Sequence, residues 1–371
     1  MEQRILTNIN KIPVRTYRWL QVNDITLKDV NIPEIKSYQK EYLPNSVPQG
    51  ITLEPSSSKV KPLGFGKDYT YGIGPELTEM AEKSFNTSFF VQGEKNTKVQ
   101  EPMILNYMAD HKDPAVISNN VIVAEENSSF TLILNYKSGE DTEAFYNGIT
   151  KIYAKSGANV TVIKLQTLNN KSHYFDSFLS IVEANAKINL VSIELGGKNS
   201  ITSNHSYLLG DNAEGHVDTV YFGSEKRYID MNYVMSHRGR RAKGNILVKG
   251  ALLDESNKIF RGTIDFKKGA MRSKGREEEY CMILSPKAQS NAVPLLLCDE
   301  DDVEGEHAAS AGRIDESKLF YLMSRGFDEK ESRRIFIEAS FTPIIDKIPL
   351  ENLREEIKLD IKRRLDHESQ A

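Results

Sequence analysis

A histidine, a cysteine and an acidic run lie close together near residue 300, and their side chains could do chemistry. Cys298 is followed by four acidic residues at 299–302, and His307 lies between Glu306 and small neighbours. An accessible imidazole whose basicity is raised by Glu306 could act as a metal ligand or as a general base. Residue types alone favour a hydrogen-bonded structural histidine, so the role of His307 depends on its context.

The two cysteines of the chain, Cys281 and Cys298, give a weak metal signal. They are 17 residues apart, so they do not form a Cys-x-x-Cys pair. A cysteine in such a setting is more often a small buried apolar side chain. Only two cysteines in 371 residues indicate a reducing compartment, and we therefore predict a cytoplasmic protein.

Two charged stretches have simpler interpretations than a binding site. Residues 237–243 (HRGRRAK) form a basic loop, for which a solvated turn is favoured over an anion or nucleotide site or an acidic partner. Residues 269–279 carry three glutamates and are predicted to be a charged surface loop. Serine-triad, phosphate-loop, kinase and zincin motifs are missing from the sequence. The residues therefore offer no convincing catalytic constellation, and nucleotide hydrolysis by the usual route is not expected.

The composition excludes several classes of protein. A net charge of −4, with 27% charged residues, argues against a protein devoted to nucleic acid. The longest apolar runs, such as residues 293–297, are far too short for a membrane span, and the first 20 residues contain no signal-peptide core. A length of 371 residues predicts two or three structural units.

Short runs of alternating apolar and polar residues recur from residue 89 to residue 297 and predict β-strands. Turns of Asn, Gly and Ala separate them at a near-fixed period. Ala158 and Ala186 are 28 residues apart, and Ala186 and Ala213 are 27 apart. Constant turn spacing is typical of a coil whose rungs stack on one another, and Asn suits its left-handed corners. The sequence therefore favours a mainly β fold with a right-handed parallel β-helix core over a sandwich.

Helical patterns begin after residue 312. Asp315 is a predicted N-cap for a helix that ends at Gly326, and Asp328 begins a second helix that Pro343 is predicted to break. A third helix after Pro349 carries one apolar stripe, formed by Leu350, Leu353, Ile357, Ile361 and Leu365. This small helical tail has a limited core of its own, so it should pack on the β unit or on a partner.

The expected organisation has three parts. Residues 1–84 form a mixed or helical N-terminal region with a linker at 44–62, and residues 75–82 predict a short helix. Residues 85–312 form the β-helix core. Residues 313–371 form the C-terminal helical subdomain.

Several motifs between residues 237 and 340 lie in the order and register of one known family. They are residues 247–254 (LVKGALLD), 260–264 (FRGTI), 282–285 (MILS), 306–308 (EHA), 312–315 (GRID) and 319–326 (LFYLMSRG). With these runs the sequence resembles the SufB/SufD family of iron–sulfur cluster assembly scaffolds. The resemblance agrees with a β-helix followed by helices and implies a scaffold without catalytic activity of its own.

The resemblance also implies candidate site residues. In this family the nascent cluster is expected to use a cysteine and a glutamate of the SufB type and a histidine of the SufD type. His307 falls on that histidine, whereas Glu279 and Ala308 stand where SufB-type chains have the cysteine and the glutamate. The chain therefore resembles SufD. Cys298 falls on a cysteine of SufB-type chains and is the second candidate ligand, while Gly305 stands where many SufD chains have a cysteine.

Partners follow from the same resemblance. The two scaffold types pair through their β-helices, their C-terminal helices recruit the ABC-type ATPase SufC, and a cysteine desulfurase supplies sulfur. The expected ATPase-docking residues here are Leu319, Phe320, Tyr321, Arg325, Gly326 and Ile335. A transient iron–sulfur cluster at the subunit interface is the expected cargo. The resemblance leaves open whether the chain forms a homodimer in isolation and whether reduced flavin binds.

Two interpretations of other classes stay open beside the scaffold. A β-helix enzyme acting on carbohydrate would need opposed carboxylates along a groove, and residues 299–302 offer no clear opposed pair. The second open interpretation is a purely structural β-solenoid without metal chemistry.

Overall fold

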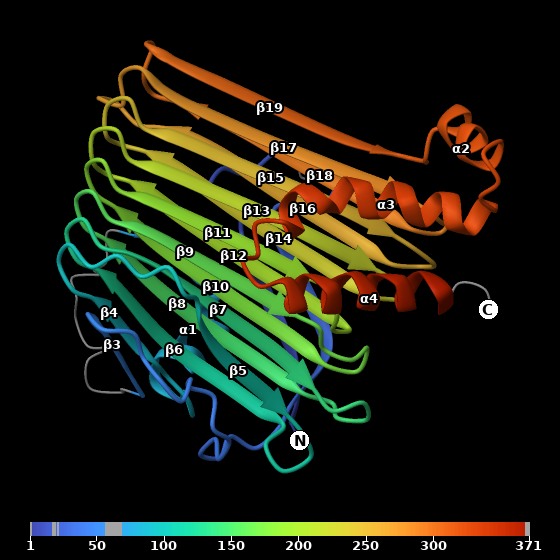
Figure 1. The fold of residues 1–371 in the computed structure, drawn as a ribbon, viewed down its shortest axis with the longest axis horizontal. Helices are drawn as coiled ribbons and strands as arrows, with labels where there is room; N and C mark the ends of the chain where they lie inside the picture. The colour runs from blue at the N-terminus through green and yellow to red at the C-terminus, as the bar shows by residue number, and fades with distance from the viewer. Residues whose placement is uncertain (1, 17–19, 21, 56–68, 368–371) are drawn as a thin grey trace.

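The computed structural model describes residues 2–16, 20, 22–55 and 69–367, and it shows two long sheets that face each other (Figure 1). Successive strands alternate between the sheets, and nearly all neighbours within a sheet run parallel. Each coil of the chain therefore adds one strand to each sheet. This architecture confirms the predicted parallel β-helix.

Nine strands form one sheet and eight form the other. The nine-stranded sheet contains, from its first to its last rung, β3 (Ile51–Glu54), β4 (Phe90–Gly93), β6 (Ala115–Ala124), β8 (Phe145–Ala154), β10 (His173–Val182), β12 (Asn199–Leu208), β14 (Tyr228–His237), β16 (Asn257–Phe266) and β18 (Gln289–Cys298). The eight-stranded sheet contains β5 (Met103–Ala109), β7 (Ser129–Ser138), β9 (Asn159–Gln166), β11 (Lys187–Glu194), β13 (Glu214–Gly223), β15 (Lys243–Leu252), β17 (Ser273–Ile283) and β19 (Val303–Gly312).

The small-residue turns form one stacked corner of the coil, as the turn spacing predicted. Asn127, Asn185 and Asn212 adopt left-handed φ values of 57°, 57° and 58°, which asparagine tolerates better than most residues. The Asn212 side-chain amide donates to the Asn185 side-chain oxygen at 3.0 Å. Ala186 and Ala213 follow two of these corners and are fully buried. The corner residues therefore fix both the sharp turn and the stacking of rungs.

The space between the sheets is the lumen of the β-helix, and inward-facing side chains fill it. Apolar side chains from both sheets form its largest hydrophobic cluster. Several strands, including β10 and β12, are buried along their whole length because other layers cover their outer faces too. Burial on both faces weakens the apolar–polar alternation that marks a half-buried strand.

Two helices cover the outer face of the eight-stranded sheet: α3 (Glu329–Ile345) and α4 (Glu351–His367) (Figure 1). The α4 stripe of Leu353, Ile357, Ile361 and Leu365 is buried against α3 and this sheet, which confirms that the tail packs on the β unit. The prediction that Pro343 breaks the second helix is wrong. Pro343 lacks an N–H donor two residues before the last residue of the helix, and the Asp346 N–H still bonds to the Thr342 carbonyl at 2.8 Å.

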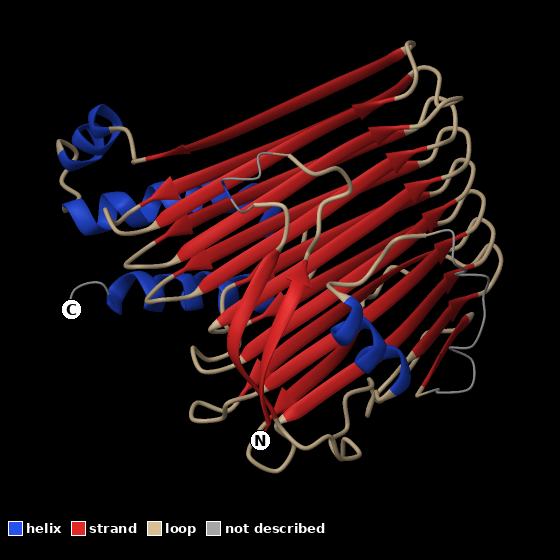
Figure 2. Ribbon diagram, turned by 180° about the vertical axis from the view of Figure 1, so that it is seen from behind, coloured by secondary structure: helices blue, strands red, loops and turns tan. Residues whose placement is uncertain are grey.

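The outer face of the nine-stranded sheet is covered by an antiparallel hairpin, β1 (Glu2–Ile9) with β2 (Ile25–Ile32), and by α1 (Pro75–Lys83) (Figure 2). The short helix expected at 75–82 is confirmed, but the hairpin was not expected in a mixed or helical region. Its apolar side chains pack on outward-facing residues of the sheet, such as Phe145 and Phe175. Within the expected linker, Ile51–Glu54 is strand β3, and residues 56–62 lie outside the described residues.

The two ends of the β-helix differ. At the first rung, Tyr42 stacks on Tyr107 with ring centroids 5.0 Å apart, and the Asn106 N–H donates to the Tyr42 carbonyl at 2.9 Å. At the other end, β18 and β19 are the outermost strands, and β19 is exposed along nearly its whole length. Within the described residues no segment pairs with the outer edge of either strand. We call this end, formed by β18 and β19, the open end.

Candidate functional site

His307 lies in the middle of β19, in register with Glu277 of β17. Along β17, Gly275, Glu277, Glu279 and Cys281 are buried, while the residues between them are exposed or half-buried. The buried set therefore faces the lumen, since successive side chains of a strand point to opposite faces. Register partners in a parallel pair share a face, so His307 also faces the lumen, at its open end.

Glu306 lies on the opposite face of β19 from His307. Its side chain is 72% exposed, and its carboxylate lies 3.6 Å from the Arg276 guanidinium on the neighbouring strand. From this position the carboxylate does not face the His307 ring. The lumen-facing neighbour of His307 in the sheet is Glu277.

Cys298 ends β18 at the exposed corner that leads to β19. Its thiol donates to the Glu300 carbonyl at 3.1 Å, and the Glu300 carboxylate accepts from the Gly269 N–H at 2.8 Å. Lys267 donates to the Asp299 carboxylate at 3.3 Å. The interpretation of Cys298 as a buried apolar side chain is therefore wrong, because it lies at an uncovered corner whose acidic residues serve corner contacts.

A groove of about 650 Å³ reaches His307 from the side of β18. It is lined by Thr16, Leu20 and Val22, by residues 291–295, and by His307 itself. The buried Arg261 side chain holds the N-terminal part of this wall, because its Nε donates to the Val22 carbonyl at 2.6 Å and its guanidinium pairs with Asp230. Segments more than 200 residues apart in the sequence thus shape the surroundings of His307.

Two buried carboxylates, Glu277 and Glu279, lie on the rung below His307, and the burial of both was not predicted from the sequence. Residues 269–279 were predicted to be a charged surface loop, but most of this stretch belongs to β17. The prediction is wrong because the glutamates alternate between the lumen and the outer face. A period-two pattern from Gly275 to Cys281, with apolar or small residues at its ends, is the signal that could have found them.

The two lumen carboxylates have different partners. Glu279 forms an ion pair with the fully buried Lys258 and accepts a hydrogen bond from the Tyr221 hydroxyl at 3.2 Å. Burial raises the pKa of Glu279, and the Lys258 ammonium opposes that rise. Both carboxylate oxygens of Glu277 are buried, and neither has a hydrogen-bond partner in the part of the chain that the structure describes. Burial, with the nearby Glu279 charge, raises the pKa of Glu277 to about 8.

Cys281 faces the lumen beside this pair and is 4% exposed. Burial raises the pKa of its thiol. The interpretation of Cys281 as a buried side chain in a strand is therefore confirmed, and a thiol with a raised pKa is a poor nucleophile at neutral pH.

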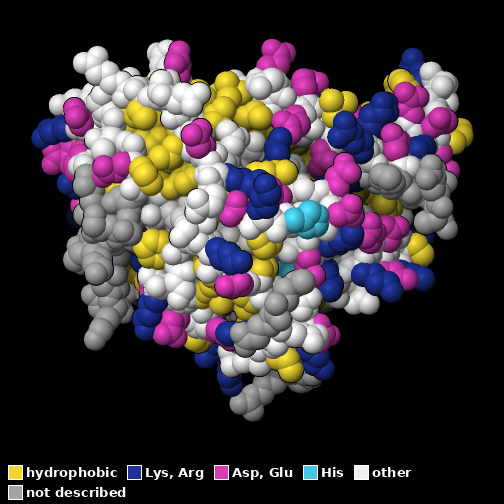
Figure 3. Space-filling model, turned by 90° about the horizontal axis from the view of Figure 1, so that it is seen from below, with side chains coloured by type: hydrophobic (Ala, Val, Ile, Leu, Met, Phe, Trp, Pro, Cys, Tyr) yellow, Lys and Arg dark blue, Asp and Glu magenta, His cyan; other side chains and the backbone are white. Residues whose placement is uncertain are grey.

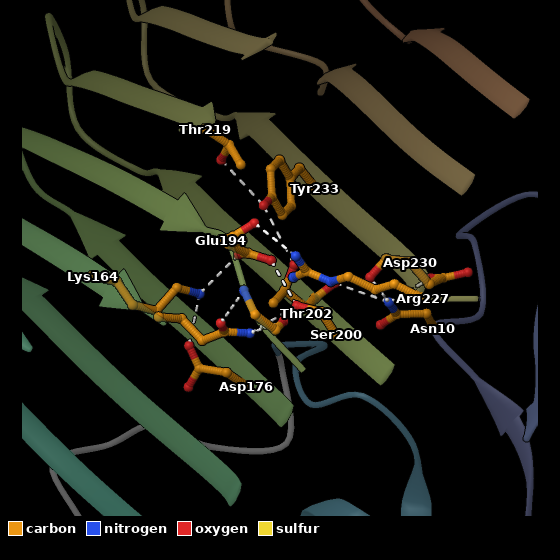
Figure 4. A network of polar contacts seen from close by, with 12 residues as sticks. Asn10, Lys164, Asp176, Glu194, Ser200, Thr202, Thr219, Arg227, Asp230 and Tyr233 are labelled. Atoms are coloured by element: carbon orange, nitrogen blue, oxygen red, sulfur yellow. Dashed lines mark hydrogen bonds and ion pairs between the residues drawn. The ribbon is translucent and has the colours of Figure 1, made fainter. Parts of the chain in front are cut away.

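A second group of buried charges lies deeper in the lumen (Figure 4). The Lys164 ammonium lies 2.9 Å from the Asp176 carboxylate and 3.3 Å from the Glu194 carboxylate, which also accepts from the Ser200 hydroxyl at 3.0 Å. Although burial opposes the charged form of Lys164, the two carboxylates hold its pKa above the usual value. Lys164 thus pairs with both carboxylates, and this group forms an ion-pair network of the protein's own in the lumen.

Helix α2 (Glu316–Met323) contains three of the six expected docking residues, Leu319, Phe320 and Tyr321. Asp315 caps the helix by accepting from the Ser317 and Lys318 N–H groups, as predicted. The helix buries none of its side chains, and Phe320 and Tyr321 are 72% and 57% exposed. A hollow of about 400 Å³ between α2 and α3 is lined by Ser317, Lys318, Tyr321, Leu322, Ile335, Phe336 and Ala339.

The remaining expected docking residues lie beside that hollow. Arg325 lies over the Tyr321 ring, 5.2 Å from its centroid, and Leu319 belongs to the same helix. Helix α2 ends at Met323, earlier than expected, and Gly326 follows in the turn with a φ of 100°, which favours glycine. The structure therefore gathers the expected docking residues around one apolar surface, which we call the α2 surface.

The basic loop at 237–243 is the corner between β14 and β15. Its Arg238, Arg240, Arg241 and Lys243 are exposed, as predicted, but His237 at the end of β14 is buried. Arg238 lies over the Tyr207 ring at 4.8 Å, and Arg241 pairs with Asp211 at 3.6 Å. Figure 3 shows basic and acidic side chains interspersed on the face seen from below. Such mixing differs from the contiguous basic surface of a nucleic-acid-binding protein.

The described residues contain no group of three or more His, Cys, Asp or Glu side chains that could hold a metal ion. A cluster at His307 would therefore need ligands from another chain or from the cargo itself. Across the same residues, no helix has both the length and the apolar character needed to cross a membrane.

Comparison with known proteins places this geometry in context. Residues 107–340, more than half of the chain, match the family described as "SUF system FeS cluster assembly, SufBD core domain". The iron–sulfur cluster assembly protein SufD of Bacillus subtilis is 30% identical over 292 residues, which cover 78% of this chain and 67% of that protein. A SufBD family protein of Pyrococcus horikoshii is 29% identical over 277 residues, covering 74% of this chain and 62% of that protein.

A SufBD family protein of Mycobacterium tuberculosis is similar over the greatest share of its own length among these three relatives. It is 23% identical over 298 residues, covering 78% of this chain and 74% of that protein. The chain thus spans between about three fifths and three quarters of the length of these relatives.

Proposed function

The chain belongs to the SufBD family of iron–sulfur cluster assembly proteins and is SufD-like, and from this premise we propose that it is one subunit of a two-chain cluster-assembly scaffold. It pairs with a SufB-like paralogue through the open end of its β-helix. It contributes His307 to a transient iron–sulfur cluster at the shared interface. It recruits a SufC-like ABC ATPase through its C-terminal helices.

The open end is the observation that carries this proposal. A stacked coil needs a cover at each end, because an uncovered rung leaves backbone groups unpaired and apolar side chains in water. Tyr38 and Tyr42 cover the first rung, whereas β18 and β19 are uncovered within the described residues. Leu296 on the last rung is 40% exposed. A second β-helix with a similar end would cover both rungs at once.

His307 is suited to hold cargo at such an interface. Iron bound to sulfide accepts soft or borderline ligands, and a neutral imidazole is one. Ala309 and Ala311 share the lumen-facing side of β19 with His307 and leave room for groups from a partner. The chain makes and breaks no bonds itself, and a cysteine desulfurase supplies the sulfur.

The α2 surface supports the ATPase part of the proposal. A short helix that exposes Phe320 and Tyr321 beside an apolar hollow has the character of a docking element rather than of a solvated helix. ATP-driven movement of two ATPase copies then shifts the C-terminal helices of both scaffold chains and opens their shared interface.

A carbohydrate-active β-helix enzyme is the alternative, and it has less support. The acidic side chains at 299–302 contact the corner, with Asp302 lying 3.6 Å from Arg272 and Asp299 bonded to Lys267. These carboxylates do not face each other across a groove as a glycosidase pair does.

Pairing through the open end is tested by co-purification with a SufB-like chain. Ala309→Arg places a long charged side chain at the open end, so we expect complex formation to fall at least tenfold. Glu140→Arg introduces the same side chain in the exposed loop between β7 and β8, far from the open end, and should leave the complex intact. Equal recovery of the complex with both variants would mean that the partner binds elsewhere.

A further inference from the structure

The two lumen carboxylates below His307 differ in a way that points to a second ligand residue. This inference rests on the proposed function, because it concerns the same cargo site. Glu277 and Glu279 are two residues apart on β17 and face the lumen together. Among the described residues, an ion pair is formed by Glu279 and not by Glu277.

The Glu279 carboxylate already has partners within the protein. The buried Lys258 ammonium pairs with its carboxylate, and the Tyr221 hydroxyl donates to the same oxygen. Lys258 is also fixed by the Asn291 carbonyl at 3.1 Å, so it cannot leave Glu279 without losing two contacts. A cation that bound Glu279 would have to displace this ammonium. Glu279 is therefore part of the protein's own structure.

The Glu277 carboxylate differs from that of Glu279 in its partners. Its residue is fully buried, and neither carboxylate oxygen has a hydrogen-bond partner among the described residues. A buried polar group without a partner is costly and is uncommon unless a ligand or function uses it. Gly262, on the other side of the lumen, leaves room for the Glu277 side chain. Any larger residue at position 262 would place its Cβ only 2.4 Å from the Glu277 carboxyl carbon.

Glu277 lies one rung from the open end, next to His307. Glu277 and His307 are register partners on adjacent parallel strands, which lie about 4.8 Å apart. Both side chains face the lumen, and no rung covers His307 within the described residues. Gly262 and Pro294 are register partners on the opposite sheet, and neither side chain carries a charge that would compete for the carboxylate.

We propose that Glu277 and His307 together form a two-residue site for divalent iron at the open end. A carboxylate oxygen and an imidazole nitrogen are both ligands that Fe²⁺ accepts. The two residues occupy one side of the metal, and its other positions are left for sulfide, water or a residue of the partner. Because Lys258 already neutralises Glu279, the second lumen carboxylate does not compete for the metal.

The test is anaerobic titration of the full-length chain with Fe²⁺, followed by X-ray absorption of the bound metal. We expect one weakly bound Fe²⁺ with nitrogen and oxygen neighbours. Glu277→Gln and His307→Ala should each weaken binding at least tenfold. Glu278→Gln is the matched control, because Glu278 makes the same substitution on the same strand but bonds to Arg276 on the other side. It should leave Fe²⁺ affinity unchanged.

Several outcomes would overturn the site. They are equal Fe²⁺ affinity in wild type and Glu277→Gln, or no Fe²⁺ bound by the wild type. Circular dichroism of each variant checks that the β-helix is retained, and a Glu277→Asp variant provides a second, smaller change if Glu277→Gln does not fold. With Asp at 277 the oxygen ligand is kept, so binding should weaken less than with Gln.

Parallel assays separate this inference from the proposed function. If Glu277→Gln binds Fe²⁺ like the wild type while the complex with a SufB-like chain still builds clusters, the site is wrong and the scaffold role stands. If no complex forms with a SufB-like chain, the scaffold role is wrong whatever the chain alone does with Fe²⁺.

Discussion

The Lys258–Glu279 ion pair is the residue-level feature on which the floor of the open end depends. Both side chains are almost completely buried. Lys258 lies on β16 and Glu279 on β17, and these strands neighbour the uncovered strands β18 and β19. Burial of one charge without its counterion is strongly destabilising, whereas loss of both charges together is much better tolerated. The pair therefore fixes how the last rungs pack, and it also decides which carboxylate is free.

We predict that Lys258→Met lowers the free energy of unfolding by about 3–5 kcal/mol. Glu279 then lies in the lumen without a counterion. The double variant Lys258→Met, Glu279→Gln should recover most of this loss. Thermal and denaturant unfolding of the three proteins measure it. Lys226→Met is the control, since Lys226 is 83% exposed and lies 3.8 Å from Glu255, and it should not change stability. A single variant as stable as the double variant would refute the role of the pair.

His237 should make stability depend on pH. Its ring is fully buried against Phe266, and burial lowers its pKa from 6.5 to about 4. Below pH 6.5 the unfolded chain takes up a proton that the folded ring does not, so stability falls as the pH falls towards 4. Relative to His237→Gln, the wild type should lose about 1 kcal/mol per pH unit in this window.

The measurement for His237 is the urea midpoint of both proteins between neutral and mildly acidic pH. The comparison with His237→Gln removes the contribution of every other titrating group. Curves that stay parallel as the pH falls would show that His237 is protonated in the folded protein or does not titrate in this range.

At the scale of elements, helix α4 attaches the C-terminal tail to the β-helix through its apolar stripe. Ile361 is fully buried in this stripe, whereas Leu359 on the same helix is 53% exposed. We predict that Ile361→Ala destabilises the tail by about 2–5 kcal/mol and speeds its cleavage in limited proteolysis. Leu359→Ala should have little effect. Equal cleavage rates for the two variants would mean that α4 is not held through this stripe.

The α2 surface is predicted to bind the ATPase without holding the fold together. Phe320 and Tyr321 are exposed, so the double change Phe320→Ala, Tyr321→Ala should leave the unfolding midpoint unchanged. It should reduce pull-down of a SufC-like ATPase at least tenfold while pairing with a SufB-like chain continues. Leu359→Ala, an exposed apolar change on α4, is the control. Intact ATPase pull-down by the double variant would remove the docking claim.

An element can be predicted from the sequence when neighbouring residues determine it, and cannot when a contact with a distant segment determines it. The corners could be predicted, because Asn at a left-handed position is a local requirement that recurs with each rung, as at Asn185 and Asn212. The α4 stripe could be predicted for the same reason. Strand β17 has a visible period-two pattern, but the burial of its glutamates could not be predicted, because they look like surface residues unless the counterion is known. Lys258 lies 21 residues away on the opposite sheet, and only the fold brings it to Glu279.

The N-terminal hairpin and the continuation of α3 past Pro343 also could not be predicted from local sequence patterns. Strands β1 and β2 are 8 residues each and are stabilised by packing on the nine-stranded sheet, a contact that no local pattern reveals. Pro343 is a helix breaker by propensity, yet its place near the end of α3 leaves few bonds to lose. His307 itself was identified from its family motif, while Glu277 became visible only through strand register.

At the scale of the whole molecule, the layers explain why one end can serve a partner. The hairpin and α1 cover one sheet, α3 and α4 cover the other, and residues near Tyr42 cover the first rung (Figures 1 and 2). The last rung is the remaining end of the coil, and it carries His307 over Glu277. The fold thus concentrates the candidate cargo ligands where a second β-helix would meet this one.

The most direct test of this account is cluster assembly by the complex of this chain with a SufB-like chain and a SufC-like ATPase. Iron and acid-labile sulfide are counted per complex after anaerobic reconstitution with a cysteine desulfurase, for the wild type, His307→Ala and the exposed control His111→Ala. The account predicts that all three complexes assemble, that His111→Ala retains wild-type cluster content, and that His307→Ala loses at least nine tenths of it. Equal cluster content in His307→Ala and the wild type would contradict the central claim that this chain is a scaffold subunit holding cargo at its open end.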